Sequence, residues 1–293
     1  MFILKNYVII TDSTTDLPPQ LIKDLNIDVL PLTFTVNNKT YKNLPDWSEL
    51  PLNEFYSFMR NGNIPSTSQI NPDTFIESFT PYLESGKDIL YIAFSSGLSG
   101  TFQSVNVAKQ KLLGDYPDRK IVVVDSLCAS MGEGLLVYYA AKFKDEGMDI
   151  DTLETWLNNN KLNLCHWFTV DDLHYLHKGG RVSSAVAIIG SMLNIKPILH
   201  VDDDGHLILM KKARGRQKSL DMLVSKIQED GIDLENQIVF ISHGDCKDEA
   251  QYVADNIKNK CNVKDVVINT IGPVIGSHSG PGTMAVFFMG KKR

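Results

Sequence analysis

Short apolar runs alternate along the chain with longer segments whose apolar residues recur at helical spacing. The runs at residues 7–11, 89–94 and 121–125 each lead into a cluster containing Asp, Ser or Thr, and a helical pattern follows. Continuous apolar runs of this length are typical of strands buried on both faces of a parallel sheet. The first half of the chain therefore predicts an α/β domain, whose ligands bind beyond the carboxyl ends of its strands.

A polar segment at residues 158–163, NNNKLN, interrupts this pattern and predicts a domain junction. Beyond it, apolar runs predict strands at 165–170, 238–245, 266–268 and 284–290, and periodic segments predict helices at 183–193, 218–230 and 248–260. The Asp-Gly pair that ends Asp202-Asp203-Asp204-Gly205 predicts a hairpin turn. The second half is therefore also predicted to mix helices and strands.

Length, composition and charge limit the classes of protein to which this chain can belong. The chain has 293 residues, 43% of them hydrophobic and 22% charged, which is enough for two domains of ordinary size. A net charge of -6, with both signs mixed along the chain, argues against a nucleic-acid partner or a basic membrane patch.

The cysteines and the apolar segments bear on where the protein works. The four cysteines (Cys128, Cys165, Cys246 and Cys261) lie far apart, and the chain starts without a signal peptide's layout. No segment approaches the roughly 18 apolar residues that span a bilayer. These features predict a cytoplasmic protein with reduced thiols and no transmembrane segment.

The segment at residues 88–101, DILYIAFSSGLSGT, joins a buried strand to a helix through a turn of Ser and Gly. The first amides of a helix lack partners and the helix dipole is positive there, so the turn favours a small anion such as a carboxylate. An ordinary turn and helix cap is the alternative for an isolated segment of this kind. Residues 65–69, PSTSQ, predict a second loop rich in hydroxyls.

The same turn can be compared with the known sequence motifs of nucleotide-binding sites and of hydrolases. It lacks the Lys and the spacing of a P-loop, and Gly97 with Gly100 gives only half of a dinucleotide fingerprint. The sequence Gly97-Leu98-Ser99-Gly100 faintly resembles a nucleophile elbow, although its second Gly comes one position early. A stand-alone serine hydrolase acting on acyl esters, with Ser99 or Ser96 as nucleophile and His278 as base, is therefore kept as the alternative.

A metal site is not expected. Asp171, Asp172, His174 and His177 cluster in sequence, but they lack an H-E-x-x-H arrangement and a thiolate partner. We predict neither a metal nor a cofactor.

Six motifs in order resemble the DegV family over nearly the whole chain: TDSTTDLP, PSTSQ, SSGLSGTFQS, VVDS, VDDLHYLHKGGRVSSAVAIIGSMLNIKPILH and IGPVIGSHSGPG. Proteins of this family bind fatty acids and serve as the acyl-carrying subunit of bacterial fatty acid kinase. The resemblance implies a two-domain α/β fold. The N-terminal parallel-sheet domain would span residues 1–162, and a C-terminal α/β domain with a mixed sheet would span 163–293. It also implies a fatty acid as ligand and a separate ATP-dependent kinase as partner, and it argues against catalysis by this chain itself.

The resemblance also implies the residues that hold the ligand. Thr67 and Ser99 would bind the fatty-acid carboxylate, and His278 would lie near them. Ser96 and free amides at residues 96–101 are further candidate donors.

Other residues would serve the kinase. Arg214, with His278, would assist phosphoryl transfer, and Arg181 would dock the kinase subunit. Gly215 departs from relatives that often have Thr there, so any contact of that side chain is lost.

Estimates of the free energy of burying a fatty acid are consistent with a protein that carries one. Burying roughly 15 methylenes, as in palmitate, at about 0.8 kcal/mol each gives ample affinity. The carboxylate, in contrast, costs several kcal/mol to bury unless charge or hydrogen bonds replace water. The hydroxyls of Thr67 and Ser99 could supply such hydrogen bonds.

Overall fold

The computed structural model describes residues 6–183 and 194–293. Its strands are β1 (Tyr7–Asp12), β2 (Asp28–Leu30), β3 (Thr33–Val36), β4 (Lys39–Lys42), β5 (Ser66–Ser68), β6 (Asp88–Ala93), β7 (Ile121–Asp125), β8 (Leu164–Thr169), β9 (Ile195–Val201), β10 (Leu207–Arg214), β11 (Ile238–His243), β12 (Asp265–Thr270) and β13 (Met284–Met289). The helix expected at 183–193 lies outside the described residues, apart from Ser183.

The α-helices of the described residues are α1 (Pro19–Asp24), α2 (Leu52–Arg60), α3 (Pro72–Glu84), α4 (Thr101–Asp115), α5 (Met131–Asp145), α6 (Ile150–Asn160), α7 (His174–Lys178), α9 (Arg216–Asp230), α10 (Lys247–Cys261) and α11 (Pro273–Ser279). Short 3-10 helices are η1 (Ser13–Thr15), η2 (Lys161–Asn163) and η3 (Leu234–Asn236).

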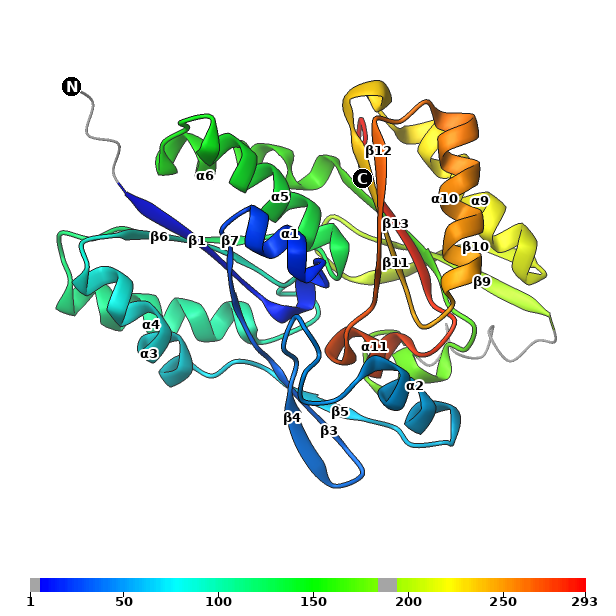
Figure 1. Cartoon of the computed structure of the whole chain (residues 1–293), viewed down its shortest axis with the longest axis horizontal. Coiled ribbons are helices and arrows are strands. Elements are labelled where there is room, and N and C mark those ends of the chain that lie inside the picture. The colour runs from blue at the N-terminus through cyan, green and yellow to red at the C-terminus, as the bar shows by residue number, and fades with distance from the viewer. Residues whose placement is uncertain (1–5, 184–193) are drawn as a thin grey trace.

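The first sheet has the strand order β2-β1-β6-β7, and every pair in it is parallel. All residues of β1 and β6 are buried, because helices cover both faces of the sheet. Helices α3 and α4 lie on one face and α5 and α6 on the other (Figure 1). The predicted parallel-sheet α/β domain is confirmed.

The second sheet is mixed and has the order β10-β9-β8-β13-β11-β12. Only the pair of β11 and β12 is parallel, while the other neighbours run antiparallel. Helices α9 and α10 cover its outer face (Figure 1). The expected hairpin at 202–205 joins β9 to β10, and the predicted mixed sheet is confirmed.

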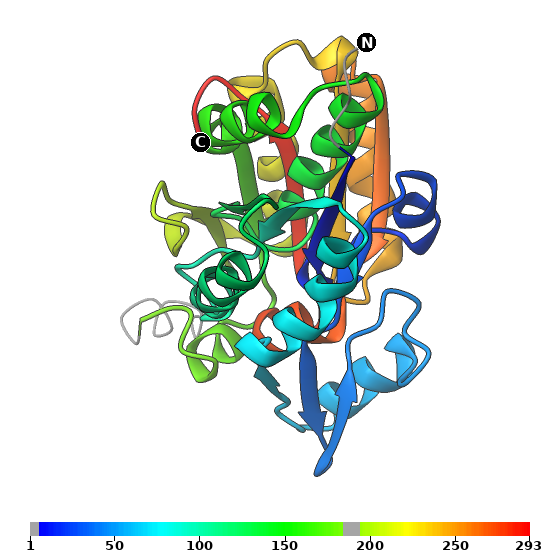
Figure 2. The same ribbon diagram turned by 90° about the vertical axis from the view of Figure 1, so that its left-hand side faces the viewer.

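A small third sheet, β4-β3-β5, was not expected in full. The loop predicted at residues 65–69 is wrong at its centre, because Ser66–Ser68 pairs antiparallel with β3, placing Thr67 opposite Phe34. Three hydroxyl residues carry no apolar alternation, so only this pairing with a distant strand makes them a strand. The sheet extends away from the two larger ones (Figure 2).

Helix α5 lies between the two large sheets and contacts strands of both (Figure 1). One continuous hydrophobic core therefore joins Leu90 and Val124 of the first sheet to Phe168 and Phe287 of the second. The strands of the two large sheets fall on either side of the expected boundary at 162/163, which itself stays a prediction.

Glu133 of α5 is fully buried beside Asp12, and the hydrogen bonds around it require a proton. Thr11 Oγ1 lies 2.9 Å from the carbonyl of Ile92 and 3.1 Å from Glu133 Oε1, and Thr14 Oγ1 lies between the carboxyls of Asp12 and Glu133. Each hydroxyl has one proton for two acceptors. Burial and the Asp12 charge raise the pKa of Glu133 well above its ordinary value, so its carboxyl keeps a proton that supplies one of the two missing donors.

This proton makes stability depend on pH. The folded protein keeps a proton on Glu133 that the unfolded chain loses above about pH 4.3, so the contribution of Glu133 to the unfolding free energy falls as pH rises, by up to about 1.4 kcal/mol per unit. Glu133→Gln mimics the protonated carboxyl and should remove this loss. In urea denaturation from pH 4 to pH 9, the stability of Glu133→Gln relative to wild type should therefore rise with pH. Parallel curves for the two proteins would contradict a buried proton on Glu133.

Among the described residues, no helix combines the length and hydrophobicity needed to cross a membrane. Within the same part of the chain, no three His, Cys, Asp or Glu side chains are grouped so that they could hold a metal ion.

Candidate functional site

A pocket of about 180 Å³ lies between the two large sheets. For comparison, a dry engineered cavity of about 150 Å³ is large enough to bind benzene. Its apolar walls come from both halves of the chain and include Phe94, Leu98, Phe168, Leu176, Leu207 and Ile275. The pocket can therefore hold an apolar organic group.

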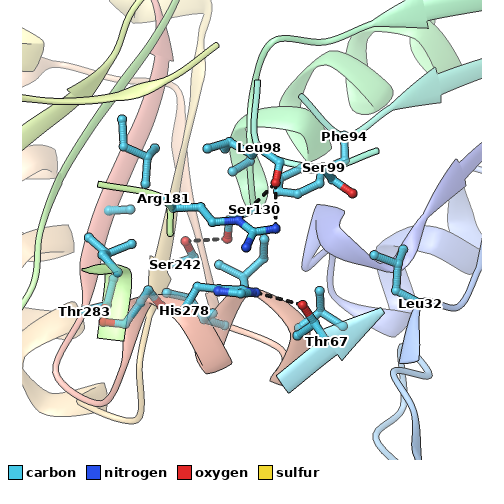
Figure 3. A pocket seen from close by; sticks show the side chains of 18 of the residues that line it. Leu32, Thr67, Phe94, Leu98, Ser99, Ser130, Arg181, Ser242, His278 and Thr283 are labelled. Carbon is cyan, nitrogen blue, oxygen red and sulfur yellow. Dashed lines mark hydrogen bonds between the residues drawn. The ribbon is translucent and has the colours of Figure 1, made fainter. Parts of the chain in front are cut away.

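Polar side chains from four separate segments line the same pocket. Thr67 comes from β5, Ser99 from the turn before α4, Arg181 from the segment after α7, and His278 from α11. Arg181 and His278 enter from one side and face Thr67 and Ser99 on the other (Figure 3). The structure thus brings together Thr67, Ser99 and His278, which the sequence predicted as ligand-binding residues, and adds Arg181, which was predicted only to dock the kinase.

His278 orients the hydroxyl of Thr67. Its Nε2 lies 2.8 Å from Thr67 Oγ1, while its Nδ1 is buried without a hydrogen-bond partner and packs against Gly179, where a side chain would collide with it. Burial and the nearby Arg181 charge lower the pKa of His278 to about 4, so the ring is neutral at pH 7. If Nε2 carries the proton, Thr67 accepts it and keeps its own O–H for a ligand.

The turn before α4 satisfies its own amides. The amides of Ser96, Gly97, Leu98 and Ser99 donate to Asp125 Oδ1 or to oxygens of Ser95. The amide of Thr101 donates to Ser99 Oγ. The expectation of free amides here is therefore wrong for these five positions, because the carbonyl of Ser95 and the side chains of Ser95, Ser99 and Asp125 act as internal acceptors.

Ser99 remains on the pocket, and a glycine lets its turn approach the chain just after strand β5. A Cβ at Gly100 would collide with Gln69 Oε1, so any larger residue there would displace the Gln69 side chain. Gln69 in turn donates to Ser104 Oγ of α4 at 3.0 Å. The PSTSQ motif therefore packs directly against the SSGLSGT motif and the helix that follows it.

Arg181 is half-buried, and its guanidinium lies in the pocket wall. Its Nε and Nη2 donate to the carbonyl of Leu98, at 3.1 and 2.9 Å, and its Nη1 donates to the carbonyl of Gly179. Burial lowers the pKa of Arg181. Among the described residues this pocket cation has no carboxylate partner, while the kinase-docking role expected for Arg181 stays a prediction.

Two other expected residues lie outside the pocket lining. Ser96 belongs to the turn before α4 but does not contribute to the lining, and Arg214 is exposed at the end of β10. Gly215 has φ +90°, a conformation that would strain a Thr.

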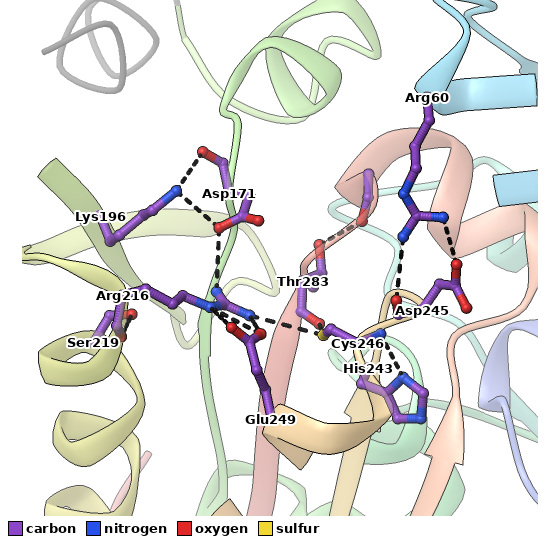
Figure 4. A network of polar contacts seen from close by, with 11 residues as sticks. Arg60, Asp171, Lys196, Arg216, Ser219, His243, Asp245, Cys246, Glu249 and Thr283 are labelled. Carbon is purple, nitrogen blue, oxygen red and sulfur yellow. Dashed lines mark hydrogen bonds and ion pairs between the residues drawn. The ribbon is translucent and has the colours of Figure 1, made fainter. Parts of the chain in front are cut away.

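Arg216, two residues after Arg214, belongs to a separate polar network (Figure 4). It pairs with Glu249 at 2.5 Å and with Asp171 at 3.6 Å, and Lys196 also pairs with Asp171 at 2.8 Å. Its charge is therefore matched by carboxylates, unlike that of Arg181.

The described residues do not assemble a serine hydrolase triad. Ser99 Oγ is 3.0 Å from Thr101 Oγ1, whereas His278 pairs with Thr67. The free Nδ1 of His278 has no carboxylate to orient the ring.

Sequence reasoning missed a second polar pair on the pocket, Ser130 and Ser242. Ser130 follows β7 and precedes α5, and Ser242 is the second-last residue of β11, so a position at or beyond the end of a buried strand was the available signal. Nothing in the sequence indicated that these two segments meet.

Comparisons with known proteins agree with this geometry. The family model of the uncharacterised DegV family matches residues 6–291. A DegV domain-containing protein of Clostridium perfringens is 48% identical over 287 residues, covering 98% of both chains. Among solved structures, a fatty-acid-binding DegV family protein of Thermus thermophilus matches with a TM-score of 0.88 at 28% identity, over 97% of this chain and 99% of that one. DegV of Bacillus subtilis, a fatty acid binding protein, matches with a TM-score of 0.84 at 28% identity, over 98% and 100%.

Proposed function

The chain belongs to the DegV family, and from this premise we propose that it binds one long-chain fatty acid, such as palmitate, in the pocket between its two large sheets. The observation that carries the proposal is an apolar cavity in which one unmatched cation and several hydroxyls meet. Fatty-acid binding by the relatives from T. thermophilus and B. subtilis supports it.

The pocket can stabilise both the apolar chain and the charged carboxylate of such a ligand. The apolar walls take up the methylenes, each of which contributes about 0.8 kcal/mol when buried. Arg181 offsets the charge of the carboxylate, and the hydroxyls of Thr67 and Ser99 replace its hydrogen bonds to water. The neutral ring of His278 holds Thr67 in position without adding a second charge.

We further propose that the protein is a carrier and not itself an enzyme. It would present the bound carboxylate to a separate ATP-dependent kinase, which forms the acyl phosphate, and it would need neither a metal nor a cofactor of its own. Its four cysteines are free, which fits a reducing cytoplasm.

Native mass spectrometry tests the proposed carrier against the hydrolase. The purified protein should carry one adduct of roughly 250 Da, the mass of an acid with about 15 methylenes. An empty protein that hydrolyses acyl esters would overturn the proposal.

The hydroxyls of Thr67 and Ser99 should each contribute to affinity. Thr67→Ala and Ser99→Ala leave a buried carboxylate short of a donor, which should cost about 1 to 3 kcal/mol each, or about 5- to 150-fold in the dissociation constant. Fatty-acid titration by calorimetry measures this cost. Ser66→Ala is the matched control, because Ser66 is exposed on the same strand and does not line the pocket. Unchanged affinity in the double variant would place the carboxylate elsewhere.

Arg214 should matter for transfer and little for binding. Because it is exposed outside the pocket, Arg214→Ala should keep fatty-acid affinity within about twofold and slow acyl-phosphate formation by about tenfold or more. An assay reconstituted with the kinase, run beside Lys212→Ala on the same exposed strand, measures both quantities. Equal losses of binding and transfer would contradict the transfer role.

A further inference from the structure

The pocket contains a second polar position that the proposed carboxylate site does not use. Ser130 precedes α5 and Ser242 belongs to β11, and their hydroxyl oxygens lie 2.9 Å apart where the two halves of the chain meet (Figure 3). Both residues line the pocket and are buried, with exposures of 3% and 0%. Ser130 has φ +53°, an unfavourable conformation for serine that the surrounding contacts must hold in place.

The hydrogen bonds of this pair leave a donor free. Ser130 Oγ donates to Ser242 Oγ at 2.9 Å and lies 2.6 Å from Asp16 Oδ2, and the amide of Gly272 donates to Asp16 Oδ1 at 2.8 Å. Ser130 has only one proton for these two contacts, and burial raises the pKa of Asp16 to about 7, so a protonated Asp16 supplies the other. The hydroxyl of Ser242 then accepts from Ser130 and keeps its own proton for an acceptor in the pocket.

Two more polar atoms of the pocket lining lack partners. His166 Nδ1 and Ser279 Oγ are buried without a hydrogen bond, in residues that are 4% and 6% exposed. Burial and the Arg293 charge keep the pKa of His166 well below its ordinary value, so its ring is neutral and one of its nitrogens can accept a hydrogen bond. Buried polar groups are seldom left unpaired, so unpaired ones beside a cavity point to a polar partner within it.

Charge separates this position from the carboxylate site. Arg181 lies beside His278, whose pKa it lowers, whereas the carboxyl of Asp16 stands directly behind Ser130. A ligand carboxylate is therefore attracted to Arg181 and gains nothing beside Asp16. The group that fits beside Ser242 is neutral, donates one hydrogen bond and accepts another.

We propose that the pocket favours fatty acids that carry a hydroxyl group along the acyl chain, with this hydroxyl bound by Ser242 and by an unpartnered polar side chain of the same pocket lining, His166 or Ser279. The ligand hydroxyl accepts from Ser242 Oγ and donates to His166 or Ser279. A ketone would lack the proton for the second of these bonds, and a second carboxylate would find no positive counter-charge beside Asp16. This inference rests on the proposed function, because it assigns the rest of the ligand to the same pocket.

Competition binding with stearate and a set of hydroxystearates, whose hydroxyl is placed at successive carbons, tests the inference. At least one isomer should bind as tightly as stearate or more tightly. A pocket that left the hydroxyl unpaired would bind every isomer about tenfold or more weakly than stearate. Ser242→Ala should lower the affinity of the preferred isomer relative to stearate by about tenfold. Ser219→Ala, which removes a buried hydroxyl of α9 outside the pocket, should keep the wild-type ratio.

Each outcome decides one point. Weaker binding of every hydroxystearate, or an unchanged ratio in Ser242→Ala, overturns the inference and leaves the proposed carrier intact. Failure of stearate itself to bind would overturn the proposed function as well. If Ser242→Ala does not fold, the isomer profile of the wild-type protein still distinguishes a paired ligand hydroxyl from an unpaired one.

Discussion

Replacing Arg181 with Ala should weaken palmitate binding by about 30- to 1000-fold, the largest loss expected from any single change in the pocket. The guanidinium is half-buried and has no acidic partner in the part of the chain that the structure describes, so it can serve as the counter-charge for a carboxylate. Removing one member of a buried charge pair leaves the other unpaired, which costs about 2 to 4 kcal/mol. Calorimetric titration of wild type and Arg181→Ala measures the loss.

A matched ligand separates charge from structure. Methyl palmitate has the same chain without the charge, so Arg181→Ala should affect its binding far less than that of palmitate. Arg60→Ala removes an exposed arginine that pairs with Asp245 and should leave both affinities unchanged. Equal losses for the acid and the ester would make Arg181 structural. If Arg181→Ala instead changed only the carrier concentration at which the kinase is half-saturated, the result would favour a role of Arg181 in docking the kinase.

Arg293→Ala should lower the free energy of unfolding by about 3 to 5 kcal/mol. The side chain of Arg293 is buried, and it donates to the carbonyls of Leu127, Lys161, Leu164 and Asp202, at 2.8 to 3.2 Å. These carbonyls belong to segments on both sides of the junction between the two large sheets. Truncation would leave several buried acceptors unpaired, and guanidinium chloride denaturation followed by tryptophan fluorescence would report the change.

The neighbouring lysine gives the control. Lys292→Ala removes the same charge from an exposed side chain one position earlier and should change stability by less than about 0.5 kcal/mol. A loss below about 1 kcal/mol in Arg293→Ala would show that water replaces the guanidinium at these carbonyls.

The local pattern of apolar residues was sufficient to predict the parallel sheet. The runs at 7–11, 89–94 and 121–125 are apolar at nearly every position because helices cover both faces, and that burial is visible in the sequence itself. Strand β5 shows the opposite case. Its three hydroxyl residues pair with β3, more than thirty positions earlier, and the local pattern contains no trace of that partner.

The site shows the same division between local and long-range information. Thr67, Ser99 and His278 could be chosen because each lies in a distinctive motif. The direction of Arg181, in contrast, depends on its bonds to the carbonyl of Leu98, 83 residues away. The contact of Ser130 with Ser242 spans 112 residues. Such placements follow from packing of the two halves and from no pattern that either segment carries alone.

A crystal structure of the protein with bound palmitate tests the central claim most directly. We predict an acyl chain that runs between the apolar walls of the two halves, with its carboxylate facing Arg181 and its oxygens roughly 2.6 to 3.2 Å from the hydroxyls of Thr67 and Ser99. A carboxylate beside Ser130 and Ser242, with the methyl end against Arg181, would contradict this prediction, as would palmitate bound outside this pocket.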